Sequence, residues 1–133
     1  MSVRRQAGRT SEAIPILEQV VADRQRLLGD HPDTVTARAN LAGSYWQAGR
    51  TDEAIPIEEQ VVADYERLLG DHPNTVTARA NLAGSYRQAG RTSEAIPILE
   101  QVVADRQRLL GDHPDTVAAV RVLEAWHNGN RAT

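Results

Sequence analysis

Hydrophobic residues recur at helical spacing in two kinds of segment that alternate along the chain. In the first kind, exemplified by residues 33–48, Leu41, Ala42, Tyr45 and Ala48 fall on one helical face. The second kind, exemplified by residues 51–69, carries a longer stripe: Ala54, Ile55, Val61, Val62, Tyr65, Leu68 and Leu69. We call these first-type and second-type helices. The pattern predicts six helices, at residues 10–28, 33–48, 51–69, 74–89, 92–110 and 115–128.

The pattern is an internal repeat with a period of 41 residues, marked by Gly8, Gly49 and Gly90. Residues 8–48 and 49–89 differ at only six positions, and the third copy is identical to the first from Gly90 to Val117. The connections are short, so successive helices must pack antiparallel. Because no pair can cover its apolar stripe alone, we expect the pairs to stack into an all-α, right-handed α-solenoid.

The expected layout is one array over residues 1–133. It has an orphan helix at 10–28, repeats at 33–69 and 74–110, and a capping helix at 115–128. The stub before the orphan helix resembles the tail of a first-type helix, because residues 5–8 match residues 87–90. This leaves an apolar edge on the orphan helix, and we predict self-association through that end.

Local signals predict where a repeat's helices begin and end. Thr51 or Asp52 is expected to cap a second-type helix, and Gly70 to end it. Pro73 suits the first turn of the next helix, and Gly49 closes the first-type helix before it.

Composition narrows the classes of function. The net charge is −3, so no basic field draws the chain to nucleic acid or to an acidic membrane. All fifteen basic residues are arginine and there is no cysteine; this arginine-rich, alanine-rich usage is typical of a GC-rich bacterial genome. No apolar run approaches the ~18 residues of a membrane span, and the start has no signal core. We expect a cytoplasmic protein.

The run from Asn40 to Ile55 closely resembles the tetratricopeptide (TPR) signature. The matching residues are Leu41, Ala42, Tyr45, Gly49 and Ala54, and again Leu82, Ala83, Tyr86, Gly90 and Ala95. The long second helix makes each unit similar to the kinesin-light-chain type, which is common also in bacterial multidomain regulators. Two departures are arginine at 38 and 79, where the family often has tryptophan, and Glu58 at a usually apolar position.

The resemblance implies a concave groove lined by first-type helices, which holds peptide segments of a partner protein. The candidate groove residues are Thr36, Asn40, Gly43, Trp46 and Gln47, then Thr77, Asn81, Gly84, Arg87 and Gln88. An asparagine amide can both donate to and accept from an extended peptide, although it can equally bond to neighbouring backbone. Trp46 fits either ligand contact or packing, and an arginine such as Arg87 would favour acidic peptides. The lone helix glycines fit close approach of a neighbour or a ligand.

Other sites find little support. His31, His72 and His113 each lie beside an aspartate, but repeats displace them by one step, so they cannot converge on one metal ion. We interpret each His-Pro as the start of a helix. No catalytic triad, phosphate loop or metal-ligand spacing is present, so we expect no enzyme, no cofactor and no metal.

Two functions remain open. One is a scaffold that binds a partner protein, as the sensor portion of a larger regulator. The other is a structural array that forms a homo-oligomer through its unfinished ends without a separate ligand.

A final expectation concerns charge inside a repeat. If Ala42 faces Ala54 across an antiparallel hairpin, Arg38 lies opposite Glu58. We therefore predict a partly buried Arg38–Glu58 ion pair without a counterpart at Arg79, whose opposite residue is Leu99.

Overall fold

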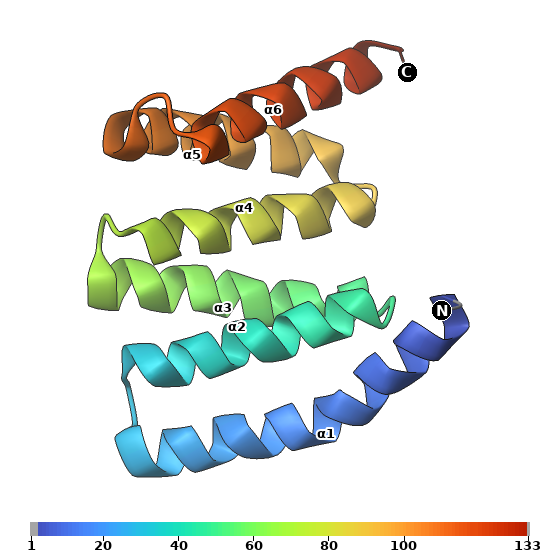
Figure 1. The fold of residues 1–133 in the computed structure, drawn as a ribbon, viewed down its shortest axis with the longest axis vertical. Coiled ribbons are helices and arrows are strands. Elements are labelled where there is room, and N and C mark those ends of the chain that lie inside the picture. The colour runs from blue at the N-terminus through green and yellow to red at the C-terminus, as the bar shows by residue number, and fades with distance from the viewer. Residues whose placement is uncertain (1–2, 133) are drawn as a thin grey trace. The chain divides into compact units, whose positions relative to one another are not determined.

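The computed structural model describes residues 3–132, and the side chains of residues 11–129. Within that range the chain forms six α-helices and no strand. The helices are α1 (Val3–Leu28), α2 (Pro32–Gln47), α3 (Thr51–Leu69), α4 (Pro73–Gln88), α5 (Thr92–Leu110) and α6 (Pro114–Ala132) (Figure 1). The prediction of an all-α repeat fold is confirmed.

The main difference in helix bounds lies at α1. The sequence pattern placed a turn at Gly8 and a helix start at residue 10, but the helix runs unbroken from Val3. The expected first-type tail at residues 5–8 is therefore wrong. Continuing the helix through Gly8 satisfies the backbone groups of this segment within α1 itself. The structure bears out the bounds of α3 and α5, while α2, α4 and α6 each start one residue earlier, at a proline. Helices α2 and α4 also end one residue earlier than predicted, and α6 continues to Ala132.

First-type helices begin at a histidine cap followed by proline. His31 precedes α2 with extended backbone, and its Nδ1 accepts a hydrogen bond from the Asp33 N–H at 3.0 Å. His72 and His113 do the same for Asn74 and Asp115. This satisfies one of the unpaired N–H groups at each helix start, and the missing N–H of proline costs nothing there.

Second-type helices begin without a side-chain cap. Residue Arg50 occupies the cap position of α3, and its carbonyl accepts from the N–H groups of Glu53 and Ala54 at 3.1 Å. The expectation of a Thr51 or Asp52 cap is wrong, because both residues already lie inside the helix. Gly70 does end α3, with φ +60°, and Gly49 follows α2 with φ +79°. Both backbone conformations disfavour residues that carry a Cβ.

The chain divides into two compact units, Met1–Gly70 and Asp71–Thr133. In the first unit, α2 packs against both α1 and α3, and in the second, α5 packs against both α4 and α6. The core of the first unit is a cluster of five buried residues: Ile14, Leu41, Ala42, Tyr45 and Ala54. In the second unit Ala83, Ala95 and Val102 are fully buried, and Leu99 is also buried. Across the described residues, none of the helices is both long and apolar enough to cross a bilayer.

Candidate functional site

In the first unit, a stripe of α2 remains exposed while the rest of that helix is buried. Asn40, Gly43, Trp46 and Gln47 are all exposed, and they lie three, six and seven residues apart, on one face. The Trp46 side chain is 44% exposed, which is unusual for so large an apolar group. These four candidate residues therefore form one accessible surface.

Thr36, the fifth candidate on α2, has a structural contact instead. Its hydroxyl lies 2.6 Å from the Tyr65 hydroxyl of α3, and Thr36 is only half-buried. The equivalent Thr77 is exposed, because Arg106 replaces the tyrosine in that repeat. The two threonines thus have different surroundings despite identical flanking sequence.

The second unit presents the same stripe on α4. Thr77, Asn81, Arg87 and Gln88 are exposed, whereas Gly84 is half-buried. The Arg87 guanidinium lies 5.3 Å from the centroid of the Trp126 ring, which belongs to α6. This cation–π contact orients the arginine that replaces Trp46.

The two helix glycines have open space beside them. A Cβ added to Gly43 or Gly84 would meet no atom within 4 Å. Close approach of a neighbouring helix, one of the two expected explanations, is therefore wrong for the described residues. Each glycine instead leaves a notch beside an asparagine, at Asn40 and at Asn81.

In each unit, an arginine in the turn after the first-type helix contacts the tyrosine of that helix. Arg50 lies 4.6 Å from the centroid of the Tyr45 ring, and its Nε donates to Glu53 at 2.8 Å. This hydrogen bond holds the pKa of the Glu53 carboxyl below its ordinary value. Arg91, Tyr86 and Glu94 repeat the arrangement in the second unit. The end of α2 that carries Trp46 is thereby fixed to α3.

A network of ion pairs joins the helices inside each unit. Arg38 of α2 lies 3.4 Å from Asp64 of α3, and it also donates to Gln25 of α1. Asp64 accepts a second bond from Arg67, which reaches Asp30 in the loop before α2. In the second unit the same positions are Arg79, Asp105, Arg108 and Asp71.

This network corrects the expected ion pair. Glu58 is buried, as predicted, but the ion pair that the structure gives Arg38 is with Asp64. An equivalent pair joins Arg79 to Asp105, so the arginine's ion pair does not distinguish one repeat from the other. The expected register paired Arg38 with Glu58, but its guanidinium meets Asp64, six residues further along α3.

The three repeat histidines, His31, His72 and His113, cap three different helices. Each occupies its own helix start, and within the described residues no three His, Asp or Glu side chains form a group that could hold a metal. The interpretation of His-Pro as a helix start is confirmed.

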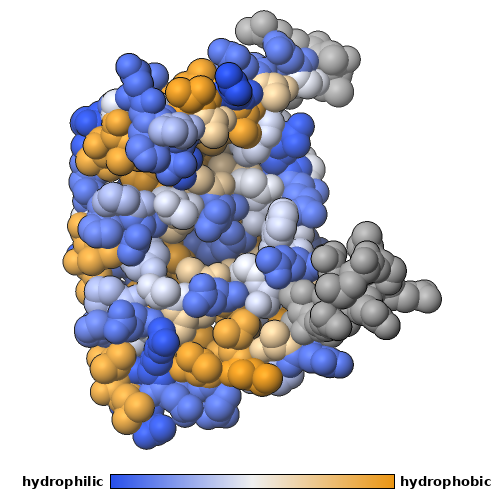
Figure 2. Space-filling model, in the orientation of Figure 1, coloured by the Kyte–Doolittle hydropathy of each residue, from blue (hydrophilic) through white to orange (hydrophobic). Residues whose placement is uncertain are grey.

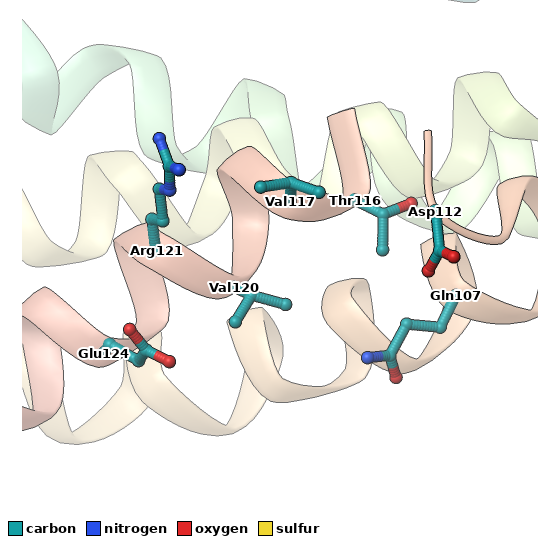
Figure 3. A pocket seen from close by; sticks show the side chains of 7 residues that line it. All are labelled: Gln107, Asp112, Thr116, Val117, Val120, Arg121 and Glu124. Carbon is teal, nitrogen blue, oxygen red and sulfur yellow. The ribbon is translucent and has the colours of Figure 1, made fainter. Parts of the chain in front are cut away.

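Sequence reasoning did not single out an open groove of about 300 Å³ in the second unit. It is lined by Gln107 of α5, Asp112 of the loop, and Thr116, Val117, Val120, Arg121 and Glu124 of α6. Two valines lie between Arg121 and Glu124 at one end and Gln107 and Asp112 at the other (Figure 3). The only sequence signal for it is the departure of α6 from the repeat after Val117.

Comparison with known proteins agrees with this architecture. Two family models described as tetratricopeptide repeat match residues 2–67 and 75–115. No curated protein sequence matches the chain. A crystal structure from Podosopora anserina, described as having kinesin light chain nearly identical TPR-like repeats, is 34% identical with a TM-score of 0.85. The alignment covers 96% of this chain and 63% of that one, so this chain spans less than two thirds of its relative.

A second structure extends the likeness in fold. BtubC (BKLC) from P. vanneervenii has a TM-score of 0.69 at 16% identity, over 98% of this chain and 67% of that one. The matched family models, the repeated helix pairs and the likeness to kinesin-light-chain repeats together lead to one conclusion: the chain belongs to the tetratricopeptide-repeat family.

Proposed function

We propose that the protein binds extended peptide segments of a partner protein, through the exposed stripe of α2 in the first unit and through the equivalent stripe of α4 in the second. Tetratricopeptide repeats generally mediate protein–protein interaction. The observation that carries the proposal is the exposure of Asn40, Gly43, Trp46 and Gln47 on α2, a helix that is otherwise packed. Exposed tryptophan on a fixed helix is a typical anchor for binding energy.

The side chains on these stripes indicate the chemistry of the ligand. Each asparagine amide has two donors and an acceptor site, which suits the N–H and C=O groups of an extended backbone. The open space beside Gly43 and Gly84 leaves room for that backbone to approach. Arg87 adds a cation already oriented by Trp126, so we expect a peptide with an acidic residue.

A peptide-display experiment tests the proposal. Peptides selected on the full chain should share an acidic position, and changing both Asn40 and Asn81 to alanine should weaken their binding at least about tenfold. Trp46→Ala should weaken it by a similar factor. The matched control is Gln101→Ala, an exposed amide on α5 outside both stripes. Selected peptides that bind these variants as tightly as the original chain would refute the proposal.

Self-association is the second candidate function, favoured by one observation. Ile16 is 67% exposed on α1, the helix that the sequence predicts to have an uncovered apolar edge. Burying such surface between copies would be favourable, and the extent would rise with concentration. Light scattering over a concentration series measures it directly. A strictly monomeric species at millimolar concentration would exclude this function.

A further inference from the structure

Helices α1, α3 and α5 carry nearly the same sequence but have different neighbours. A first-type helix precedes and packs against two of them: α2 covers one face of α3, and α4 covers the same face of α5. On α3 this face consists of Ala54, Ile57, Glu58, Val61 and Asp64. The equivalent residues of α1 are Ala13, Ile16, Leu17, Val20 and Asp23. This set on α1 is called the α1 open face below.

Burial shows that the described residues leave part of the α1 open face uncovered, although Leu17 packs against the core of the first unit. Ala54 is fully buried, whereas the equivalent Ala13 is only half-buried. Ile57 packs against the core of the first unit, but Ile16 is 67% exposed. Figure 2 shows apolar surface over α1, at the bottom of the view. The missing neighbour is therefore a helix at the place that α2 takes beside α3.

Charge on the α1 open face identifies what that helix should carry. Asp64 and Asp105 each receive an arginine from the first-type helix that precedes them, and their side chains are 8% and 11% exposed. Asp23 is 46% exposed, and its partners in the described part of the chain are Gln19 and Arg26 of its own helix. Asp23 therefore presents a carboxylate to which an arginine at the position of Arg38 would bind.

A second charged residue, Arg26, indicates how the docked helix would be aligned along α1. Arg67 of α3 bonds to Asp30 in the loop before α2, and Arg108 bonds to Asp71 in the same way. The equivalent Arg26 of α1 is 68% exposed and bonds to Asp23. A helix that docks like α2 would bring an aspartate to Arg26, eight residues before the arginine that meets Asp23.

A second copy of this chain does not supply such a helix from its ends. Helix α6 has Val120 and Glu124 where α2 has Arg38 and Ala42. Glu124 would place a carboxylate in the tight alanine contact, and Val120 offers Asp23 no donor. In a symmetric pair of α1 helices, Asp23 of one copy could meet Arg26 of the other only if the two helices crossed near the carboxyl end of α1. Ile16 would then lie opposite the segment beyond Leu28 and stay uncovered.

We propose that the α1 open face is a docking site for a helix of a partner polypeptide with the first-type pattern. That pattern is an aspartate, an arginine eight residues later, then leucine and alanine three and four residues after the arginine, as in Asp30, Arg38, Leu41 and Ala42. The arginine binds Asp23, the aspartate binds Arg26, and the leucine and alanine cover Ile16 and Ala13. This site is distinct from the exposed stripes of α2 and α4.

The probe is a labelled synthetic peptide with the sequence of residues 29–50, added to the full chain and followed by fluorescence anisotropy. It should bind saturably with one peptide per protein. Asp23→Asn in the protein should weaken binding about tenfold, because a charge-assisted bond is lost. The same loss is expected when the peptide carries Arg38→Gln, and the two changes together should cost no more than either alone. Arg26→Gln should weaken binding only severalfold, since that pair is exposed.

Two further variants test the apolar part of the face. Ile16→Asp should abolish saturable binding, whereas Ala22→Asp should leave it unchanged. Ala22 is a matched control because it is exposed on α1, as are Ala63 on α3 and Ala104 on α5, so no first-type helix covers that position. Circular dichroism of each variant shows whether helix content is preserved, and Asp23→Asn keeps the shape of the side chain.

Three results would overturn the proposal. The first is no saturable binding up to about 1 mM peptide. The second is binding that Asp23→Asn and Ile16→Asp leave intact, which would place the peptide elsewhere. The third is a dimer of the chain that Ile16→Asp dissociates but the peptide does not, because a second copy would then occupy the face.

Discussion

Asp64 lies where three segments of the first unit meet. It accepts from Arg38 of α2, from Arg67 of α3 at 3.1 Å and from Gln60 of α3 at 2.9 Å, and Arg67 extends the network to the loop at Asp30. A buried carboxylate with this many donors is tolerated because its lone pairs are satisfied. Arg79 and Arg108 make the equivalent bonds to Asp105, so each unit is joined by charge as well as by its apolar core.

Removing either helix-to-helix arginine should therefore destabilise the protein to a similar degree. We expect Arg38→Ala and Arg79→Ala each to lower the free energy of unfolding by about 1–3 kcal/mol, because each leaves a buried aspartate with one donor fewer. Adding Asp64→Asn to Arg38→Ala should recover part of that loss. Urea unfolding measures both. A loss confined to Arg38→Ala would instead favour a special role for the first repeat.

The exposed members of these networks predict a loss of stability in acid. Arginine hydrogen bonds hold the pKa of Asp30, Asp71, Glu53 and Glu94 below their ordinary values of 3.8 for aspartate and 4.5 for glutamate. The folded state thus binds these protons more weakly than the unfolded state. The stabilisation is complete above about pH 4.5 and is lost as the pH falls through the lowered values.

The measurement is the melting temperature between pH 6 and pH 3. It should fall less steeply in a variant with both Asp30→Asn and Asp71→Asn, and less steeply in high salt, which screens exposed pairs. An unchanged slope in that variant would show that other carboxyl groups govern acid unfolding.

At the scale of the helix, glycines at different places have opposite roles. Gly70 ends α3 with φ +60° and ψ −129°, a region that side chains with a Cβ rarely adopt. Gly43 lies inside α2, and an added Cβ would meet nothing within 4 Å. The sequence places both glycines in clear helical context, but only the backbone angles and the open space separate their roles.

Alanine substitution should therefore have opposite effects at the two glycines. Gly70→Ala should destabilise by about 1–3 kcal/mol through backbone strain, while Gly43→Ala should stabilise by up to about 1 kcal/mol through helix propensity. Thermal unfolding of the two variants measures the difference. If Gly43→Ala also weakens binding of the selected peptides, the glycine serves close approach of the ligand rather than stability.

At the scale of the whole molecule, the same residue has a different environment in each repeat. Ala13, Ala54 and Ala95 are equivalent in sequence, but the latter two are fully buried and Ala13 is half-buried. The difference arises because a first-type helix covers α3 and α5 on this face, while no other helix of the described residues covers it on α1.

Substituting leucine at these three positions should distinguish the covered faces of α3 and α5 from the α1 open face. Ala54→Leu and Ala95→Leu should each cost about 1–3 kcal/mol, because the added atoms have no room in the core. Ala13→Leu should change the free energy of unfolding by less than about 0.5 kcal/mol. Chemical denaturation of the three variants gives the comparison. Equal costs at all three positions would mean that the α1 open face is covered in solution.

The repeat, the six helices and most of their ends could be predicted from the sequence. The signals are local: helical spacing of apolar residues, proline in a first turn, and glycine after a last turn. The start of α1 could not be predicted this way, because Gly8 has the same neighbours as Gly49, and only a packed helix before it would select the turn over continued helix. The exposure of Asn40, Trp46 and their equivalents was likewise predictable from periodicity.

Only the tertiary structure decided the partners of the charged side chains. Nearly identical stretches of sequence give Asp64 an arginine from another helix and leave Asp23 with partners on its own helix. It also decided that Arg38 bonds to Asp64, because the way α2 packs on α3 sets which carboxylate the guanidinium can reach. Local sequence determines helix type and helix ends through short-range sterics and hydrogen bonds. Burial and ion pairing depend on which helix lies alongside, and in a repeat protein that is set by position in the array.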